Sequence, residues 1–293
     1  MNCNINHKRL VFENLEKRAM LAGNVVSSPV VNGFLNLCGD AKGDQFLVRQ
    51  TSSGDWCVTG INKTKIDGQK SETFSDVCSI NIKTLGGNDI VGVATGCLPG
   101  ALCIDTGGGN DLVALVALKV GSLSVSTGAG NDALIVAGLS TQSSVSTTDI
   151  SPLSTTSQSS TVCLDVGAGN NIVLLAAIQT DSLSLKSGDG NDYIGLAGVC
   201  VDGCLSVDTG TGIDLLGIID SSASVAKLSG GSQPGDLLAT GLNSFGQTSS
   251  DFKVTLNLDP LVKIINAQLK SVQKTMMSSL NLNALTTLPP LQI

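Results

Sequence analysis

Residues 107–113 read GGGNDLV, and five variants of this phrase occur between residues 85 and 216. The variants are LGGNDIV at 85–91, GAGNDAL at 128–134, GAGNNIV at 167–173, GDGNDYI at 188–194 and GTGIDLL at 210–216. The alignment of these phrases places one acidic or amide residue of each at the same position: Asp89, Asp111, Asp132, Asn171, Asp192 and Asp214. Asp236 is a seventh such residue, in a looser copy of the phrase. The differences between successive position numbers are 22, 21, 39, 21, 22 and 22. A repeat of this length predicts a solenoid, in which one structural unit stacks on the next.

The one long step coincides with a change in composition. Residues 140–161 are rich in Ser and Thr and nearly free of charge. The step from Asp132 to Asn171 is 171 − 132 = 39, which exceeds a coil of 21 by 39 − 21 = 18. We therefore expect a surface loop that grows out of one coil and leaves the register of the other coils intact.

Each repeat carries two strand signals, one before the turn and one after it. Before the turn, apolar and polar residues alternate, as in Leu123-Ser124-Val125, which is typical of a strand with one buried face. After the turn the apolar runs are denser, as at 112–118 and 172–178. Gly recurs, and Val, Ile and Thr are frequent, which favours strands over helices. The predicted fold is all-β, a parallel β-solenoid of the β-roll or β-helix type.

The glycines of the turn have a conformational reason. Residues at a tight corner take positive φ angles, which Gly adopts without a Cβ penalty. We expect backbone carbonyls to point outward from the corner, with the Asp carboxylate beside them. Stacked corners then form a cage of oxygens, and Ca²⁺ prefers about six to eight such ligands. The alternative is that Gly-Asn-Asp only builds good corners, with Asn and Asp side chains bonded to backbone amides.

The phrase resembles the hemolysin-type calcium-binding repeat, or RTX nonapeptide, whose turns share Ca²⁺ between successive coils of a parallel β-roll. Counting Thr106 as turn position 1, Asp111 stands at position 6, the liganding carboxylate of that family. The resemblance implies metal ligands at the carboxylates of Asp89, Asp111, Asp132, Asp192 and Asp214 and in the turns at Gly107, Gly109, Gly128, Gly130, Gly188 and Gly190. It implies apolar anchors at position 8, namely Val91, Val113, Leu134, Val173, Ile194 and Leu216.

Three features depart from the pattern of that family. Only one phrase occurs per coil, so at most one column of metals follows. Position 1 is Thr, Val or Ser instead of Gly, and Asn171 removes a carboxylate from the middle of the column. We expect a weak or empty site beside Asn171, and the best sites at the pairs Asp89/Asp111, Asp111/Asp132 and Asp192/Asp214.

A second resemblance lies in residues 8–24, KRLVFENLEKRAMLAGN. The segment is similar to the Phe-Glu-x-Leu-Glu-x-Arg-x-x-Leu motif found near the N-termini of many secreted and surface proteins of planctomycete bacteria. The matching residues are Phe12, Glu13, Leu15, Glu16, Arg18 and Leu21. The resemblance implies that residues 1–23 are an export or sorting segment of an extracellular or cell-surface bacterial protein. The alternative is an ordinary amphipathic first helix.

Composition agrees with an exported solenoid and argues against other classes of protein. Charged residues make up 14% of the 293 residues and aromatic residues 3%, and the net charge is −7. Residues 1–23 hold four bases and two acids, so the remainder carries −7 − 2 = −9. This acidic character argues against nucleic acid or anionic lipid as a partner. No apolar run approaches the roughly 20 residues of a membrane span.

The chain has nine cysteines, which favours an oxidising compartment. Cys97 and Cys103 flank one corner of a coil and Cys200 and Cys204 flank another, so two short disulfides are predicted. The alternative is free thiols. Zinc is not expected, because the sequence has no CxxC pair and its single histidine is His7.

The repeats also indicate how the chain is organised. Residues 24–80 resemble strands and turns entering the solenoid, and Asp44 lies two coil lengths before Asp89. The solenoid is expected over 81–240, and a last strand at 251–259. Asp259-Pro260 then predicts the start of a helix within 241–293, with apolar Leu261, Ile264, Ile265, Leu269, Val272, Met276 and Leu280 at helical spacing. This helix is expected to cap the open end of the stack; the alternative is a helix that binds a partner.

These features indicate a calcium-binding solenoid that acts outside the cell as a structural or adhesive module. Its partners would be Ca²⁺ and a cell-surface polysaccharide or another surface protein. The alternatives are a metal-free scaffold and a polysaccharide lyase or glycosidase, since parallel β-helices also carry such enzymes. We disfavour the enzyme, because the outward carboxylates Asp105, Asp165 and Asp208 are not expected to lie beside bases.

Overall fold

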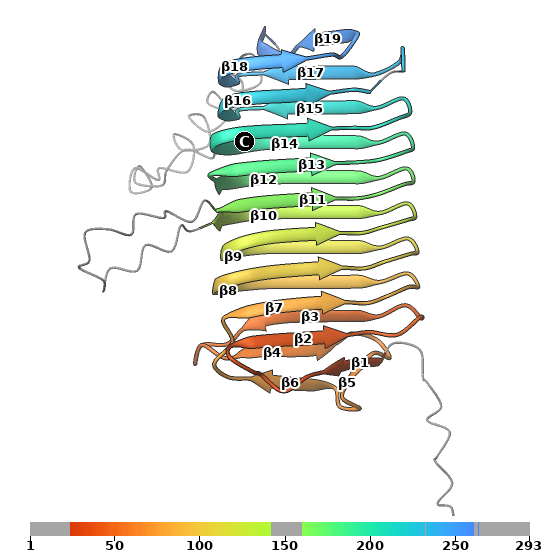
Figure 1. Ribbon diagram of the computed structural model, residues 1–293, viewed down its shortest axis with the longest axis vertical. Helices are drawn as coiled ribbons and strands as arrows, with labels where there is room; N and C mark the ends of the chain where they lie inside the picture. The colour runs from red at the N-terminus through yellow and green to blue at the C-terminus, as the bar shows by residue number, and fades with distance from the viewer. Residues whose placement is uncertain (1–23, 142–159, 232, 261–262, 264–293) are drawn as a thin grey trace, which may run out of the picture.

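Every coil of the structure contains two strands, one that leaves the glycine turn and one that returns toward the next turn (Figure 1). The computed structural model describes residues 24–141, 160–231, 233–260 and 263. We call the strands that leave the turns the exit sheet and the strands that return the entry sheet. Both sheets are parallel along the stack, and this confirms the predicted parallel β-solenoid.

The strands divide between the two sheets as follows. The exit sheet holds β3 (Gln45–Gln50), the first halves of β8 (Ile90–Asp105), β9 (Leu112–Ser126) and β14 (Tyr193–Asp208), and β10 (Ala133–Thr141), β12 (Ile172–Thr180), β15 (Leu215–Ile219), β17 (Leu237–Gly241) and β19 (Val254–Asn257). The entry sheet holds β2 (Phe34–Cys38), β7 (Ser79–Lys83), the second halves of β8, β9 and β14, and β11 (Thr161–Asp165), β13 (Ser182–Lys186), β16 (Ser222–Ser229) and β18 (Ser244–Ser250).

Equivalent residues of successive coils lie side by side. Val113 pairs with Val91 on one side and with Leu134 on the other. The six position-8 anchors form one column in the core, and each has an exposed fraction of 0%. Their burial drives the stacking, because a coil alone cannot cover its apolar face and must bury it against its neighbours.

The long step between Asp132 and Asn171 is one coil, as predicted. Leu134 pairs with Val173, and Val162 pairs with Leu123, so the coils before and after the insertion are direct neighbours. The two ends of the insertion are joined, because the Thr141 hydroxyl donates to the Ser160 hydroxyl oxygen at 2.8 Å. The Ser/Thr-rich residues 142–159 themselves lie outside the described residues.

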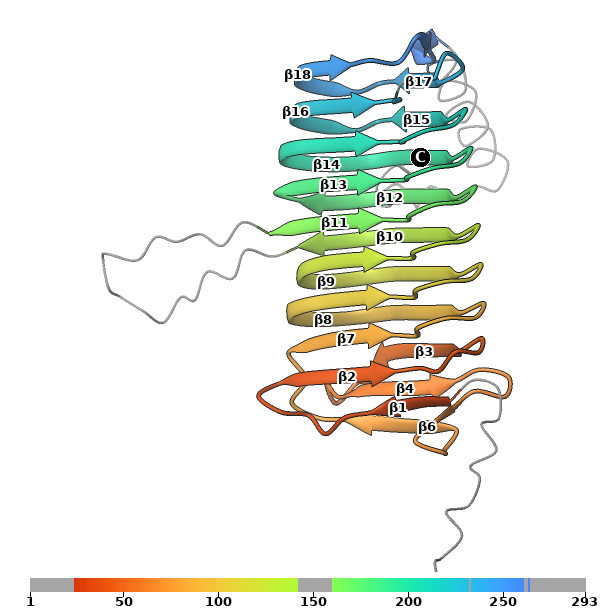
Figure 2. The ribbon, with the colours of Figure 1, turned by 45° about the vertical axis from the view of Figure 1, so that its right-hand side comes forward.

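The long step from Asp44 to Asp89 is also one coil, and the prediction of two coils was wrong. Gln45 pairs directly with Ile90. The extra residues form a layer at the N-terminal end of the stack, in which β4 (Trp56–Gly60) and β6 (Ser71–Phe74) are antiparallel, while β5 (Lys65–Ile66) pairs in parallel with β1 (Asn24–Ser27) (Figures 1 and 2). Trp56 of this layer is buried against the first full coil, where a Cβ on Gly96 would lie 2.3 Å from the indole ring.

The stack continues past residue 240, where we expected the solenoid to end. β17, β18 and β19 remain parallel to the coil beneath them, and β19 confirms the predicted last strand. The predicted capping helix and the export segment at 1–23 lie outside the described residues, apart from Asp259, Pro260 and Lys263. In the described part of the chain, we find no helix with the length and hydropathy of a membrane span.

Candidate functional site

The glycine turns stack so closely that they exclude side chains at two positions. Positions 2 and 4 of a turn have positive φ, as at Gly107 (89°) and Gly109 (136°). A Cβ on Gly128 would lie 1.7 Å from the carbonyl oxygen of Gly107, and one on Gly130 would lie 1.6 Å from that of Gly109. Glycine is therefore required here both for its backbone angle and for the close approach of the next turn. The turn carbonyls are stacked in columns as a result.

The position-6 side chains are buried and form a ladder along these turns. Each Oδ1 accepts the backbone N–H of the equivalent residue one coil earlier. Asp111 accepts from Asp89 at 2.8 Å, Asp132 from Asp111 at 2.8 Å and Asn171 from Asp132 at 3.0 Å. The ladder continues through Asp192 at 2.7 Å, Asp214 at 2.9 Å and Asp236 at 3.0 Å. All these residues have exposed fractions of 3% or less.

The second carboxylate oxygen of the ladder is different, because it is buried without a hydrogen-bond donor. Among the described residues this holds for Asp40, Asp44, Asp89, Asp111, Asp132, Asp192 and Asp214. A buried carboxylate oxygen that lacks a donor is costly, on the order of several kcal/mol if the group is charged. The repetition of this unpaired oxygen in coil after coil distinguishes the column from a set of turns that are complete by themselves.

Asn171 shows what surrounds that second oxygen. Its side-chain NH₂ occupies the equivalent place and donates to three carbonyls: Gly167 at 3.3 Å, Gly169 at 3.1 Å and Ser187 at 3.3 Å. These carbonyls belong to positions 2 and 4 of its own turn and position 1 of the next. They face into the turn, so the expectation that they point outward was wrong.

The other coils repeat this backbone, so we infer from Asn171 that their second carboxylate oxygens face the equivalent carbonyls. For Asp111 the equivalent groups are Gly107, Gly109 and Thr127, and for Asp132 they are Gly128, Gly130 and Val166. Two of these carbonyls also accept a backbone N–H from the next coil, Gly107 from Ala129 at 3.0 Å and Gly128 from Ala168 at 3.1 Å. Oxygen facing oxygen is stable only when a proton or a cation lies between the two. We call each such pocket of one carboxylate oxygen and three carbonyl oxygens a cage.

In the N-terminal coils the first-position hydroxyls donate to backbone carbonyls. Thr84 donates to the Thr106 carbonyl at 3.2 Å, Thr106 to the Thr127 carbonyl at 3.1 Å and Thr127 to the Val166 carbonyl at 3.0 Å. In the later coils the Ser187 and Thr209 hydroxyls are themselves buried without a partner among the described residues. The hydroxyls of Thr84, Thr127, Ser187 and Thr209 each lie close enough to the carboxylate of their own turn to stabilise its charged form.

Burial makes the column a poor place for negative charge. Desolvation raises the pKa of Asp44 to about 7 and that of Asp89 to about 6, and the backbone N–H that each accepts only partly opposes this effect. The charge of Asp40 raises both pKa values further. Desolvation also raises the pKa values of Asp132, Asp192 and Asp214.

A second ladder runs along the surface beside the cages. Asn110 donates its backbone N–H to the Asn88 side-chain oxygen at 2.8 Å, and Asn131 donates to Asn110 at 2.7 Å. The pattern continues to Ile213, whose backbone N–H donates to the Asn191 side-chain oxygen. The ladder ends there, because the apolar side chain of Ile213 cannot accept a hydrogen bond. The bonded Asn and Asp ladders expected for bare corners are therefore present. They use only one of the two position-6 oxygens and leave the other unexplained.

The predicted site residues are brought together as one column. All five carboxylates lie in it, and the predicted glycines occupy the positions whose carbonyls contact Asn171. Asp44 and Asp236 belong to the same column, and Asp40, which the repeat alignment missed, donates its N–H to Asp44 at 2.9 Å. Within the described ranges, no three His, Cys, Asp or Glu side chains gather at one point to bind a metal. Any ion in a cage would therefore be held mainly by carbonyl oxygens.

The predicted disulfides are not formed in the structure. Cys97, Cys103, Cys200 and Cys204 are all free thiols. Each pair is separated by a corner where the register shifts, between Leu98 and Ala101 in one coil and after Val201 in the other. This corner keeps the two members of a pair on different strand segments.

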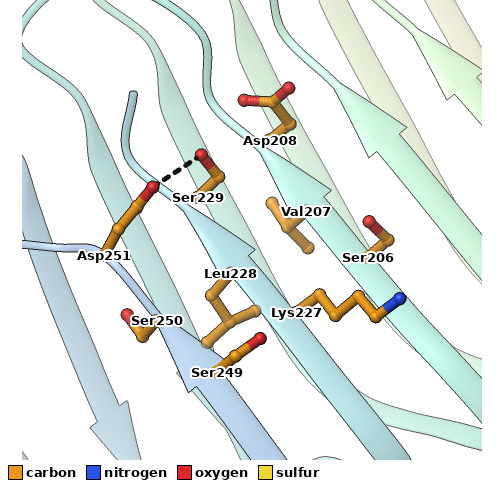
Figure 3. Close-up of a pocket in the computed structure, with 9 residues that line it drawn as sticks. All are labelled: Ser206, Val207, Asp208, Lys227, Leu228, Ser229, Ser249, Ser250 and Asp251. Atoms are coloured by element: carbon orange, nitrogen blue, oxygen red, sulfur yellow. Dashed lines mark hydrogen bonds between the residues drawn. The ribbon is translucent and has the colours of Figure 1, made fainter. Parts of the chain in front are cut away.

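A shallow groove of about 400 Å³ lies on the outer face of the entry sheet, lined by Asp208, Lys227, Asp251 and several serines (Figure 3). The expectation that outward carboxylates lack basic neighbours was wrong, because Lys186 is the register neighbour of Asp165 on one adjacent strand and of Asp208 on the other. Asp165 and Asp208 also accept backbone N–H groups two residues later, at 3.1 and 3.2 Å, which explains them as turn residues.

The chain was also compared with known proteins. No family model, no curated protein and no solved structure matches it.

Proposed function

We propose that the protein is a calcium-binding β-solenoid that serves outside the cell as a structural or adhesive module. One observation carries the proposal: a column of buried carboxylate oxygens without donors, at the position where the Asn171 amide contacts three backbone carbonyls of its own site. A hard cation would satisfy the carboxylate and the carbonyls at once. Calcium fits best, because it takes neutral carbonyl oxygens with few carboxylates and tolerates irregular geometry.

The cages would be filled to different extents. Those at Asp89, Asp111, Asp132, Asp192 and Asp214 would each hold an ion between the carboxylate and the turn carbonyls. The cage at Asn171 would stay empty, because the NH₂ group already donates to its three carbonyls. A bound ion would allow the carboxylates to be charged and would join each coil to the next.

Calcium binding would couple folding to location. The cytoplasm holds little free Ca²⁺, whereas the outside of a cell holds much more, so the solenoid would reach full stability only after export. Each site would add roughly 2.7 kcal/mol when the ion is present at 100 times its dissociation constant. As an adhesive module, the protein would bind a cell-surface polysaccharide or another surface protein.

The direct test is a thermal melt of the full chain in Ca²⁺ and in chelator. We expect Ca²⁺ to raise the melting temperature by on the order of 10 °C or more, because several sites act on one cooperative stack. Isothermal titration should show binding of several ions per chain. Equal melting temperatures under both conditions would leave only the metal-free scaffold.

The Asp132→Asn variant separates the two explanations of the cage. In chelator, we expect its melting temperature to rise by several degrees, because the new NH₂ group can donate to the three carbonyls as Asn171 does. In Ca²⁺, we expect the variant to bind one ion fewer and to gain less stability than the parent protein. Circular dichroism melts and calorimetry measure both effects.

Asp165→Asn is the matched control. It removes the same charge from an exposed position and keeps the oxygen that accepts the Gly167 N–H. If Asp165→Asn changed the calcium response as much as Asp132→Asn, the response would reflect net charge and the cages would not be the sites.

A further inference from the structure

The outer face of the exit sheet is apolar over its whole length from β8 to β17. The strands from β8 to β15 each present three outward positions, and β17 presents two. In order these are Ile90, Gly92 and Ala94; Leu112, Ala114 and Val116; Ala133, Ile135 and Ala137; Ile172, Leu174 and Ala176; Tyr193, Gly195 and Ala197; Leu215, Gly217 and Ile219; and Leu237 and Ala239. None of these residues is charged, and the Tyr193 hydroxyl is the single polar side-chain group among them.

This face is exposed in its middle part. Val116, Ile135, Ile172, Leu174 and Tyr193 have exposed fractions of 44, 36, 49, 39 and 47%, and they lie on neighbouring strands. The outer face of the entry sheet is its opposite, with Ser124, Ser184 and Ser206 along one row. The contrast shows that this fold does not require an apolar outer surface.

The face is flat and its area approaches that of a small interface. With about 4.8 Å between strands and about 3.3 Å per residue along them, seven strands of five residues cover roughly 550 Å². Standard protein interfaces bury about 600–1,000 Å² on each partner, and the largest apolar patch of a typical monomer covers about 300–600 Å². The coils stack with little rotation from one to the next, so the sheet is nearly planar (Figures 1 and 2).

The sequence of side-chain sizes on this face is largely complementary to itself. We consider a two-fold axis that lies between β12 and β14 and runs along the strands, with two exit sheets face to face. It reverses the order of the strands, so Leu174 opposes Gly195 and Ile135 opposes Gly217. On the flanking rows Ala133 opposes Leu215 and Ala137 opposes Ile219. In each of these pairs a large side chain meets a small one. Two large pairs, Ile172 with Tyr193 and Leu112 with Leu237, lie at the edge beside the turns.

The space opposite Ile135 is open in a single copy, whereas the space over Gly195 is partly filled by Leu174 of the same copy, whose Cδ2 would lie 3.1 Å from an added Cβ. A Cβ on Gly217 would meet no atom closer than the Ile194 carbonyl oxygen, at 3.8 Å. An axis along the stack would place Leu174 against itself and Gly195 against itself. That arrangement leaves a clash beside a void, so the axis along the strands is the one that fits.

We propose that the protein forms a two-fold dimer in which the exit sheets of two copies pack face to face, with Ile135 of each copy seated over Gly217 of the other. Such an interface is isologous, with the same patch on both copies. Sheets packed in this way lie about 10 Å apart. The dimer does not depend on metal in the turns, because the turns lie at the edge of the sheet.

The test measures the mass of the full chain by sedimentation between about 1 and 100 µM, a range that brackets ordinary dimer affinities. We expect a species of twice 29.8 kDa. Leu174→Glu should weaken dimerisation at least about 30-fold, because a charge is forced into the centre of the interface. Ser184→Glu, which introduces the same charged residue on the outer face of the entry sheet, should leave the affinity unchanged.

A size exchange tests the arrangement itself. Gly217→Val should weaken the dimer, and adding Ile135→Ala to it should restore most of the lost affinity, because the space is returned to the opposing copy. A monomer at all concentrations would overturn the proposal. A dimer indifferent to both Leu174→Glu and Gly217→Val would overturn it as well, since another surface would then hold the copies together.

Discussion

The Gly128→Ala variant is expected to lose more than about 3 kcal/mol of folding free energy. The added Cβ would lie 1.7 Å from the Gly107 carbonyl oxygen, so the two turns must separate. Separation breaks the hydrogen bond from Ala129 N–H to that carbonyl, at 3.0 Å, and strains the ladder from Asp111 to Asp132. Chemical denaturation followed by circular dichroism measures the loss.

Gly68→Ala is the matched control, because it isolates the contribution of the backbone angle. Gly68 has φ of 81°, close to the 88° of Gly128, but no atom lies within 4 Å of the place where its Cβ would stand. We expect this variant to lose only about 1–2 kcal/mol, which is the cost of a left-handed angle for alanine. Similar losses in the two variants would mean that the angle alone requires glycine and that the turns are not closely stacked.

In chelator, the protein is expected to lose stability as the pH rises from about 4 to about 7. Burial raises the pKa of Asp44 to about 7 and that of Asp89 to about 6, so the folded protein binds more protons than the unfolded chain in this window. The stabilisation is complete below the ordinary aspartate pKa of 3.8 and is lost as the pH passes the raised values. One pKa unit corresponds to about 1.4 kcal/mol, so the loss over the column is on the order of several kcal/mol.

With Ca²⁺ in excess, the direction of this pH dependence should reverse. The ion binds the charged carboxylate, so protonation competes with it and stability should rise with pH in the same window. Melting temperatures at several pH values, in Ca²⁺ and in chelator, measure both slopes. Asp44→Asn should flatten the slope in chelator, whereas Asp165→Asn should leave it almost unchanged. Parallel slopes with and without Ca²⁺ would contradict calcium binding in the cages.

Most of the stack could be predicted because the coils from Thr106 onward meet the same steric demand. A turn that stacks its carbonyls on those of another such turn requires Gly at positions 2 and 4, and a core that continues from coil to coil requires an apolar residue at position 8. Both demands recur in these coils, so they are visible in the sequence as a period. The insertion between Leu134 and Val173 was predictable for the same reason, since the phrase resumes in register after it. The first phrase is an exception, since Leu85 stands at position 2 with a φ of 76°.

The N-terminal layer could not be predicted, because its strands use the same alternation as the coils. Residues 56–60 have outward and inward residues in turn, as any strand with one buried face does. Nothing in that pattern tells an antiparallel neighbour from a parallel one. The long step from Asp44 to Asp89 was therefore interpreted as two coils, although only the pairing of Gln45 with Ile90 decides the matter.

The atoms that line a cage could not be predicted from the sequence, for a different reason. The alignment shows that Asn171 replaces a carboxylate, but not that one side-chain oxygen serves the ladder and the other atom faces three carbonyls. The direction of those carbonyls follows from the backbone angles of the turn. Once it is known, Asn171 becomes the most informative residue of the column, since its hydrogen bonds identify what the other coils lack.

The uniform stacking of the coils has a consequence for how such a molecule could change its length. Each coil touches only its two neighbours, and the coil from Leu112 to Asp132 presents to both sides the same turn, the same anchor and the same ladder groups. Removing or duplicating that unit in frame would join surfaces that already match. The protein could thus be shortened or lengthened by whole coils, each adding about 4.8 Å to its length, without redesign of its interior.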